Sequence, residues 1–287
     1  MRNIEFQNQQ NPKTQFDIIK LETLFDNKDL DHSPADLHIV KFFILLIAEQ
    51  GHGKHTIDFT DYDCSKGTIL TIRKDQIHRF HNTKTLEGKL LLFTDDFLIK
   101  YLEKEEANKT LLLFNELLSD PKIQLNKLDF LNIQNILKRI QEEYFNINDN
   151  HSLSIIRSEL HILITLLFRI KENNQQIKPN KKYLKEFLDL QHTVEKNAFN
   201  TNKVKDYSKL IGVSTKTLNT ITKSIVHKSA KEFIDDICTK QIKRLLINTK
   251  LSVKEIAYKS GFEETTNFYK YFKRQTKTTP EQFRNLN

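Results

Sequence analysis

The last third of the chain carries an internal repeat, in which segments 204–225 and 253–275 match at an offset of 49 positions. The matched residues are Val204, Tyr207, Ser208, Gly212 and Val213 in the first segment, and Val253, Ile256, Ala257, Gly261 and Phe262 in the second. Each segment pairs a short amphipathic stretch with a central glycine and a second amphipathic stretch, which predicts a helix-turn-helix unit. Two such units in register are a specific signal of a repeated architecture.

The glycine and the small residue before it explain the turn of each unit. Ser208 and Ala257 stand four positions before the glycines, where two helices that cross steeply need a small side chain. Gly212 and Gly261 can take the left-handed backbone conformation that ends a helix at little steric cost. Ser214 is the candidate N-cap of the helix after the first turn.

The second helix of each unit has one apolar face and one polar face. Leu218, Ile221 and Ile225 recur at helical spacing in the first unit, as do Phe268 and Phe272 in the second. The opposite faces are polar or basic, and such side chains suit phosphates and the base edges of a major groove. We therefore predict that nine residues contact DNA: Lys216, Asn219, Thr220, Lys223, Thr265, Thr266, Asn267, Lys270 and Lys273.

A continuous helical segment joins the two units. Residues 231–249 contain neither glycine nor proline, and their apolar residues fall on one broad face. At 1.5 Å per residue this helix spans roughly 28 Å. That is close to the roughly 34 Å between successive major grooves on one side of a duplex. We expect the connector to present both second helices to adjacent grooves.

The basic charge of the chain is confined to this region. Residues 181–287 hold 22 lysines and arginines against 11 acidic residues, a net charge of +11. The whole chain has a net charge of +8, so the first 180 residues carry about −3. A helical bundle with a solvated, lysine-rich surface has the same apolar periodicity. The duplication and the charge asymmetry nevertheless favour a phosphate-binding domain.

The N-terminal half changes from a strand pattern to a helical pattern. Between residues 16 and 100, short apolar or alternating runs such as 42–47 stand between close turn signals. This pattern predicts a small β-barrel or sandwich. Residues 95–175 have helical periodicity and predict helices that flank the barrel.

A polar segment with Pro179, residues 173–180, is the predicted linker. The chain is thus predicted to be α+β, with a cupin-like barrel and flanking helices in a sensing and dimerisation domain of residues 1–175. An all-α domain of residues 182–287 follows, in which a linker helix joins two helix-turn-helix subdomains.

The helix predicted over residues 152–171 carries apolar residues at the 3-4-3-4 spacing of a coiled-coil seam. These residues are Leu153, Ile156, Leu160, Leu163 and Leu167. Other faces of the helix are apolar as well, so it must bury more than one face. Either the helix lies deep in the core of its own domain, or the seam packs on a second subunit. We assign the seam as the predicted dimerisation surface of a homodimer.

The C-terminal third, about residues 182–287, resembles the AraC/XylS family of bacterial transcription regulators. The residues that stand as in the family's signature are Leu245-Leu246, Ile256-Ala257, Gly261-Phe262, Phe268, Phe272-Lys273, Pro280 and Phe283-Arg284. The resemblance implies recognition of a promoter in adjacent major grooves. It places the family's base-facing positions on Lys216, Asn219, Thr220, Thr265, Thr266 and Lys270. In the connector, Ile237 and Ile242 stand where the family has Arg and Ala, and Lys277 stands where glycine is common.

The N-terminal half is similar to the cupin-like sensor domain of the same family. Gly67, His78 and Asn82 fit the spacing of the second cupin motif, whereas the paired His-x-His of the first motif is missing. We therefore expect no metal centre and no cofactor. The barrel can instead hold a small effector, and the polar groups expected to reach it are His38, Lys41, Arg73 and His78.

These features predict a sequence-specific DNA-binding transcriptional regulator, an effector-responsive activator rather than an enzyme. Its predicted partners are double-stranded promoter DNA, RNA polymerase, a small-molecule effector and a second copy of the chain. One alternative is a metal-dependent cupin enzyme fused to a DNA-binding module, which needs three or four converging metal ligands. Another is a regulator whose barrel is filled by its own side chains and binds no ligand.

Three further features bear on where the protein works. The N-terminus is polar and lacks the apolar region of a signal peptide. The longest apolar run, residues 42–48, is too short to cross a bilayer. The two cysteines, Cys64 and Cys238, fall in different predicted domains, which favours reduced thiols. We expect a cytoplasmic protein that does not enter a membrane.

Overall fold

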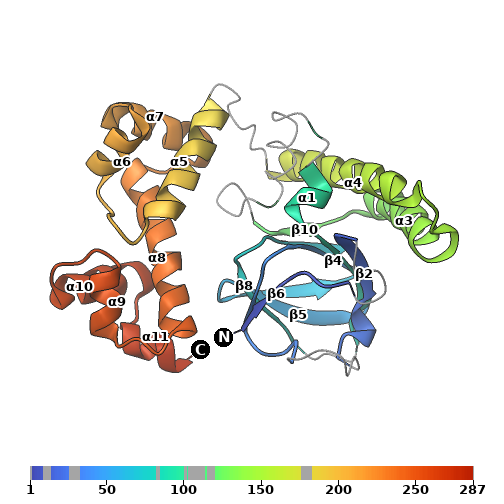
Figure 1. Ribbon diagram of the computed structural model, residues 1–287, viewed down its shortest axis with the longest axis horizontal. Helices are drawn as coiled ribbons and strands as arrows, with labels where there is room; N and C mark the ends of the chain where they lie inside the picture. Colours follow the sequence, from blue (N-terminus) through green and yellow to red (C-terminus); the bar gives the residue numbers. More distant parts are fainter. Residues whose placement is uncertain are drawn as a thin grey trace. The chain divides into compact units, whose positions relative to one another are not determined.

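A computed structural model describes residues 2–8, 14–25, 33–81, 85–99, 102, 114, 120–175 and 183–286. The chain divides into two compact units, residues 2–177 and residues 178–287. The first contains two β-sheets and several helices, and the second is helical throughout its described residues (Figure 1). The α+β class predicted from the sequence is confirmed. Asn82, much of 100–119 and the predicted linker from residue 176 lie outside the described residues.

The N-terminal unit contains two five-stranded sheets. The first has the order β1 (Arg2–Ile4), β3 (His38–Val40), β8 (Ile77–Phe80), β5 (His52–Ile57), β6 (Thr60–Ser65). The second has the order β10 (Lys122–Gln124), β7 (Thr68–Ile72), β4 (Phe43–Gln50), β9 (Glu87–Phe93), β2 (Phe16–Lys20). Paired strands are antiparallel, except that β1 and β3 are parallel.

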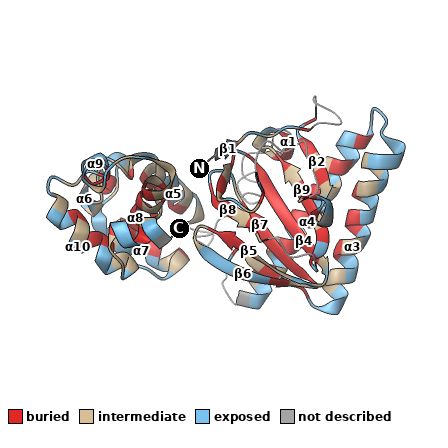
Figure 2. Ribbon diagram, turned by 90° about the horizontal axis from the view of Figure 1, so that it is seen from below, coloured by how far each residue is buried: buried red, intermediate tan, exposed pale blue. Residues whose placement is uncertain are grey.

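The second sheet is covered on both faces, which explains the continuous apolar run of β4. Ile44 and Leu46 point between the two sheets, whereas Leu45 and Ile47 point outward to the helices. Alternate residues of a strand face opposite sides, so a strand buried on both sides must be apolar throughout. Figure 2 shows most of β4 as buried, and only its last two residues, Glu49 and Gln50, are half-buried and exposed, respectively.

Helices cover the outer face of the second sheet. They are α1 (Asp95–Ile99), α3 (Lys127–Gln141), a π-helical turn (Glu142–Ile147) and α4 (Ser152–Gln175), and a short 3-10 turn (Leu21–Thr23) follows β2. The outer core unites the sheet residues Phe43, Leu45 and Phe93 with the inner faces of α3 and α4. A bidentate pair between Arg139 of α3 and Glu159 of α4 (2.6 and 2.7 Å) joins the two helices at the surface.

The predicted dimerisation seam requires a correction. Ile156, Leu160, Leu163 and Leu167 are at most 1% exposed, because they pack on the second sheet in the core of their own unit. They are therefore not available to a second subunit. Leu153 alone of the five is exposed (36%). Seam spacing arises here because the helix packs on a sheet, which also requires one narrow apolar stripe.

The C-terminal unit consists of seven helices over its described residues. They are α5 (Leu184–Asn197), α6 (Val204–Ile211), α7 (Thr215–Val226), α8 (Ala230–Asn248), α9 (Val253–Lys259), α10 (Thr265–Thr276) and α11 (Pro280–Leu286). The pairs α6–α7 and α9–α10 are the two predicted helix-turn-helix units. The connector α8 follows the first unit and precedes the second, and it contacts helices of both (Figure 1).

Caps and turns fix the ends of these helices as the sequence predicts. Gly212 and Gly261 have φ values of +73° and +79°, the left-handed conformation that ends α6 and α9. Ser214 accepts a hydrogen bond from the backbone N–H of Thr217 (3.0 Å) and caps α7. Ser229 and Ser252 form capping boxes that start α8 and α9. Within the described residues, no helix is both long and apolar enough to cross a membrane.

Candidate DNA-binding surface and effector domain

Helices α7 and α10 present polar outer faces in one compact unit. Most of the predicted contact residues are exposed: Lys216, Thr220, Lys223, Thr266, Asn267, Lys270 and Lys273. The apolar faces of the same helices are buried, with Leu218 and Phe268 fully covered. Each helix is therefore oriented by its core so that lysine, threonine and asparagine side chains face solvent, where they can meet phosphates and base edges.

Asn219 is a half-buried predicted contact in which both polar atoms of the side-chain amide are already hydrogen-bonded. Its Nδ2 donates to the carbonyl of Thr215 (3.0 Å), and its Oδ1 accepts from the backbone N–H of Ala230 (2.9 Å). That N–H is among the first of α8 and has no partner within the helix. Asn219 thus joins α7 to the start of the connector. Thr265, the first residue of α10, is half-buried.

The connector carries a buried carboxylate that sequence reasoning missed. Asp235 of α8 is only 4% exposed. Its carboxylate lies 2.7 Å from Nζ of Lys231 and 3.6 Å from a guanidinium nitrogen of Arg274 in α10. An aspartate on an otherwise apolar helix face was the available signal, because buried charges are nearly always paired.

The effector residues predicted in the barrel separate into two groups. His38 and His78 face the space between the sheets, and their ring centroids lie 4.2 Å apart. Lys41 is exposed and forms an ion pair with Asp75 (2.6 Å). Arg73 is half-buried directly after β7. The structure therefore brings the two histidines together but does not place Lys41 with them.

A third histidine, His55 of β5, joins this pair. Its ring lies 5.3 Å from that of His78 and 4.5 Å from that of Phe80, and the side chain is fully buried. Neither ring nitrogen has a hydrogen-bond partner among the described residues. Burial lowers the pKa of His55 to about 3, and the nearby His38 and His81 act in the same direction. His55 is therefore a neutral imidazole at ordinary pH.

The rest of the barrel interior is apolar. Leucine, isoleucine and phenylalanine side chains from both sheets, among them Leu46, Ile57, Leu70 and Phe80, form one buried cluster. Within the part of the chain that the structure describes, no group of three His, Cys, Asp or Glu residues could hold a metal ion. The three histidines thus form a small polar cluster inside an otherwise apolar barrel.

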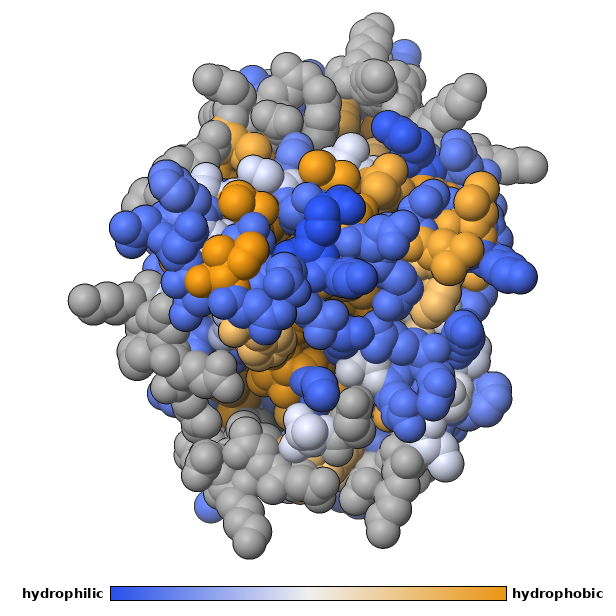
Figure 3. Space-filling model, turned by 90° about the vertical axis from the view of Figure 1, so that its right-hand side faces the viewer, coloured by the Kyte–Doolittle hydropathy of each residue, from blue (hydrophilic) through white to orange (hydrophobic). Residues whose placement is uncertain are grey.

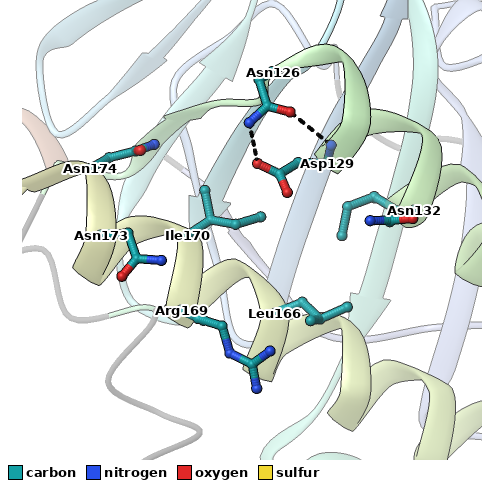
Figure 4. Close-up of a pocket in the computed structure, with 9 residues that line it drawn as sticks. Asn126, Asp129, Asn132, Leu166, Arg169, Ile170, Asn173 and Asn174 are labelled. Atoms are coloured by element: carbon teal, nitrogen blue, oxygen red, sulfur yellow. Dashed lines mark hydrogen bonds between the residues drawn. The ribbon is translucent and has the colours of Figure 1, made fainter.

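A cavity of about 410 Å³ lies between the start of α3 and the end of α4. Its lining residues are Asn126, Asp129, Asn132, Ile133, Leu166, Arg169, Ile170, Asn173 and Asn174. Figure 4 shows the bonded pair of Asn126 and Asp129 on the α3 side, with Leu166 and Ile170 extending from α4. The cavity thus combines an apolar floor with amide donors and acceptors, one carboxylate and one guanidinium.

The outer surface of α3 and α4 also exposes apolar side chains. Leu128 and Leu131 of α3 are 68% and 53% exposed, and Ile155 and Ile162 of α4 are 40% and 45% exposed. Figure 3, which views the N-terminal unit from the α3 side, shows apolar patches separated by hydrophilic side chains. This surface, named here the α3–α4 outer face, differs from the buried seam of α4.

Several known proteins are similar to this chain. Two transcriptional activators match most of it: RhaS from Enterobacter is 20% identical over 260 residues and 86% of each chain, and RhaR from Escherichia coli is 21% identical over 264 residues and 90% of each chain. Histidine kinase P4 from Formosa agariphila is 33% identical over 79 residues, which are 28% of this chain and 6% of that protein. Among solved structures, ToxT from Vibrio cholerae is 14% identical, with 94% of this chain and 97% of that chain covered and a TM-score of 0.42.

Two family models match separate parts of the chain. The model of an AraC-like ligand binding domain matches residues 21–156, which contain all strands of the two sheets except β1 and β2 and extend into the first turn of α4. The model of a helix-turn-helix domain matches residues 207–286, from α6 to α11. With both models in the order that the two units have along the sequence, the chain belongs to the AraC family of DNA-binding transcriptional regulators.

Proposed function

We propose that this regulator activates transcription by placing α7 and α10 in two adjacent major grooves of a promoter, in response to a small molecule. The observation that carries the proposal is the pair of exposed polar helix faces in one compact unit whose region has a net charge of +11. Activation rather than repression is supported by the two relatives that match most of the chain, both of which are named as activators.

The contact residues divide by chemistry. Lys216, Lys223, Lys270 and Lys273 supply positive charge for phosphates, whose neutralisation makes binding dependent on salt. Thr220, Thr266 and Asn267 supply short polar groups for base edges, and an asparagine amide pairs well with adenine. Asn219 and Thr265 belong to the same surface, but the amide of Asn219 has a structural role as well. We also propose that the regulator contacts RNA polymerase when it is bound to the promoter.

Selection of bound DNA from a random pool tests the proposal directly. The expected result is two short conserved half-sites per subunit, separated centre to centre by about one helical turn, roughly 10–10.5 base pairs. A single conserved half-site contradicts the use of both units. A pool that shows no enrichment contradicts sequence-specific recognition.

We further propose that the effector binds in the barrel beside His38, His55 and His78. A buried imidazole without a hydrogen-bond partner is unfavourable by about 1–3 kcal/mol, and a ligand hydroxyl or amide would supply the missing bond to His55. A thermal-shift screen of the wild type and His78→Phe tests this. A compound that raises the Tm of the wild type alone supports the site, and one that raises both equally places the effector elsewhere.

We propose that the chain forms a homodimer through the α3–α4 outer face. Its exposed leucine and isoleucine side chains remain unburied in the single chain and form several apolar patches, and exposed apolar patches can mark interaction surfaces.

A further inference from the structure

The two helix-turn-helix units are joined by α8, and the turn of the second unit also lies against Asn200, just before the first unit. Asp235 of α8 contacts α10 of the second unit. One carboxylate oxygen is 2.7 Å from Nζ of Lys231, and the other accepts a hydrogen bond from Nε2 of Gln275 (3.3 Å). Gln275 belongs to α10, 40 residues further along the chain. A buried carboxylate on the connector therefore holds the second recognition helix.

Lys231 extends the same network to the segment that precedes the first helix-turn-helix unit. Its Nζ also donates a hydrogen bond to the carbonyl of Asn202 (2.9 Å), in the segment between α5 and α6. The chain of contacts thus runs from Asn202 through Lys231 and Asp235 to Gln275. Each link involves a charged group, and hydrogen bonds to charged groups are stronger than neutral ones and more directional in a buried site.

Tyr271 fixes the orientation of α10 against α8. Its hydroxyl donates to the carbonyl of Asp235 (3.2 Å) and accepts from Oγ1 of Thr239 (3.3 Å). Its ring lies 5.9 Å from Nζ of Lys231 and 5.5 Å from the guanidinium of Arg274, within cation–π range. Because Tyr271 directly follows Lys270, the contacts of its buried side chain set the direction in which that lysine points.

The turns of the two units differ in what lies against them. A Cβ atom on Gly261 would lie 3.1 Å from the backbone carbonyl oxygen of Asn200, in the segment between α5 and α6 that precedes the first helix-turn-helix unit. A Cβ on Gly212, the equivalent residue of the repeat, would meet nothing within 4 Å. Both glycines have positive φ values. Only at Gly261 would a side chain therefore also press on the segment that precedes α6.

We propose that this interface makes Asp235 a positioning residue for DNA recognition. By fixing α10 relative to α7, the interface sets the offset between the two recognition helices and so selects operators by the spacing of their half-sites. The inference rests on the proposed use of both units on DNA. It adds a source of specificity that involves no contact between Asp235 and a base.

The test compares the wild type with Asp235→Asn on three kinds of operator taken from the selected sequence. These are the selected spacing, spacings changed by one or two base pairs, and one half-site alone. A rigid pair of binding units gains affinity only when both engage at once. We therefore expect Asp235→Asn to lose about tenfold in affinity at the selected spacing, to keep wild-type affinity for one half-site, and to discriminate less between spacings.

Asp236→Asn is the matched control. Asp236 is the next residue on α8, but it pairs with Lys228 (2.6 Å) and does not contact α10 in the described structure. It should bind all operators as the wild type does. The proposal is overturned if Asp235→Asn keeps the wild-type preference for spacing, or if its affinity for one half-site falls as far as that for the complete operator.

A second pair of variants reaches the interface from the other side. Gly261→Ala and Gly212→Ala introduce the same left-handed strain, but only the first pushes on Asn200. Both variants are expected to lower overall affinity, and only Gly261→Ala should weaken the preference for spacing. Equal effects on spacing contradict the proposed interface. A wild type that shows no preference for spacing at all contradicts instead the use of both units, and so separates the two failures.

Discussion

Lys270 illustrates what one exposed side chain of α10 contributes to binding. It is exposed on the outer face of the helix, so its ammonium group can reach a phosphate. Lys270→Ala should weaken binding to all sequences alike and lower the slope of log affinity against log salt by about one. Gel-shift titrations at several salt concentrations measure both quantities. Lys138→Ala, an exposed lysine of α3, is the control, and an unchanged slope for Lys270→Ala would contradict the phosphate contact.

Lys171 shows the opposite situation, a lysine that the fold buries. It lies on the inner face of α4 and is 5% exposed, and within the described part of the chain its Nζ has no hydrogen-bond partner. Burial lowers the pKa of Lys171 to about 8, against the opposing effect of Asp120. The native state is therefore destabilised below pH 8, where Lys171 is charged in both states. This destabilisation is relieved as the pH rises from about 8 to the ordinary lysine value.

Replacing the ammonium should accordingly stabilise the N-terminal unit. Lys171→Met is expected to raise the free energy of unfolding at pH 7 by about 1–3 kcal/mol. The gain should shrink as the pH rises above 8, because the wild-type lysine becomes neutral in the native state. Urea unfolding at pH 7 and pH 9.5 provides the measurement. A gain that does not change with pH would show that packing rather than charge is the cause.

At the scale of elements, the residue that ends α10 is a lysine in a backbone conformation that favours glycine, which should lower stability. Lys277 has a φ value of +65°, in the region that suits glycine. Lys277→Gly should stabilise the C-terminal unit by roughly 0.5–1 kcal/mol, since relief of left-handed strain exceeds the extra freedom of glycine in the unfolded chain. His227, which ends α7 at φ +56°, offers a matched variant, His227→Gly. The denaturant midpoints of the two variants test this expectation. A loss of stability in both variants would contradict the proposed backbone strain at Lys277 and His227.

Helices, strands and turns that depend on residues close together in the sequence could be predicted. Contacts between distant elements could not. The turns of the two units follow from Gly212 and Gly261, and the strand β4 follows from a run of apolar residues. The predicted partner of an apolar helix face was wrong where the same spacing of apolar residues suits two kinds of partner. The stripe of α4 suits a coiled coil as well as a sheet, and the sheet is its partner.

The candidate sites divide in the same way. The exposed faces of α7 and α10 could be predicted because helical period alone separates apolar from polar residues. The role of Asp235 could not, because an aspartate on an apolar helix face indicates only that its charge is paired, and its partner Gln275 lies 40 residues away. His55 was missed for a similar reason: the face of a short strand that points inward becomes known only when β5 pairs with β8.

At the scale of the whole molecule, the α3–α4 outer face predicts how two chains associate. Ile162→Glu places a charge in that face and should raise the dissociation constant of the dimer by roughly tenfold or more. Sedimentation velocity over a range of concentrations measures this. Leu210→Glu changes an apolar residue of the C-terminal unit that is more exposed (58%) than Ile162 (45%), and it should leave association unchanged. Dimers of equal strength in both variants would place the interface elsewhere.

The shared position of α8 has a consequence for how the DNA-binding unit unfolds. Because α8 packs on helices of both halves and Asp235 links them, neither half can melt while leaving the other with its core complete. The halves should therefore unfold in a single cooperative transition, unlike two domains that fold independently. A substitution that destabilises one half therefore destabilises the other half as well. Selection on either recognition helix must consequently act on the stability of both.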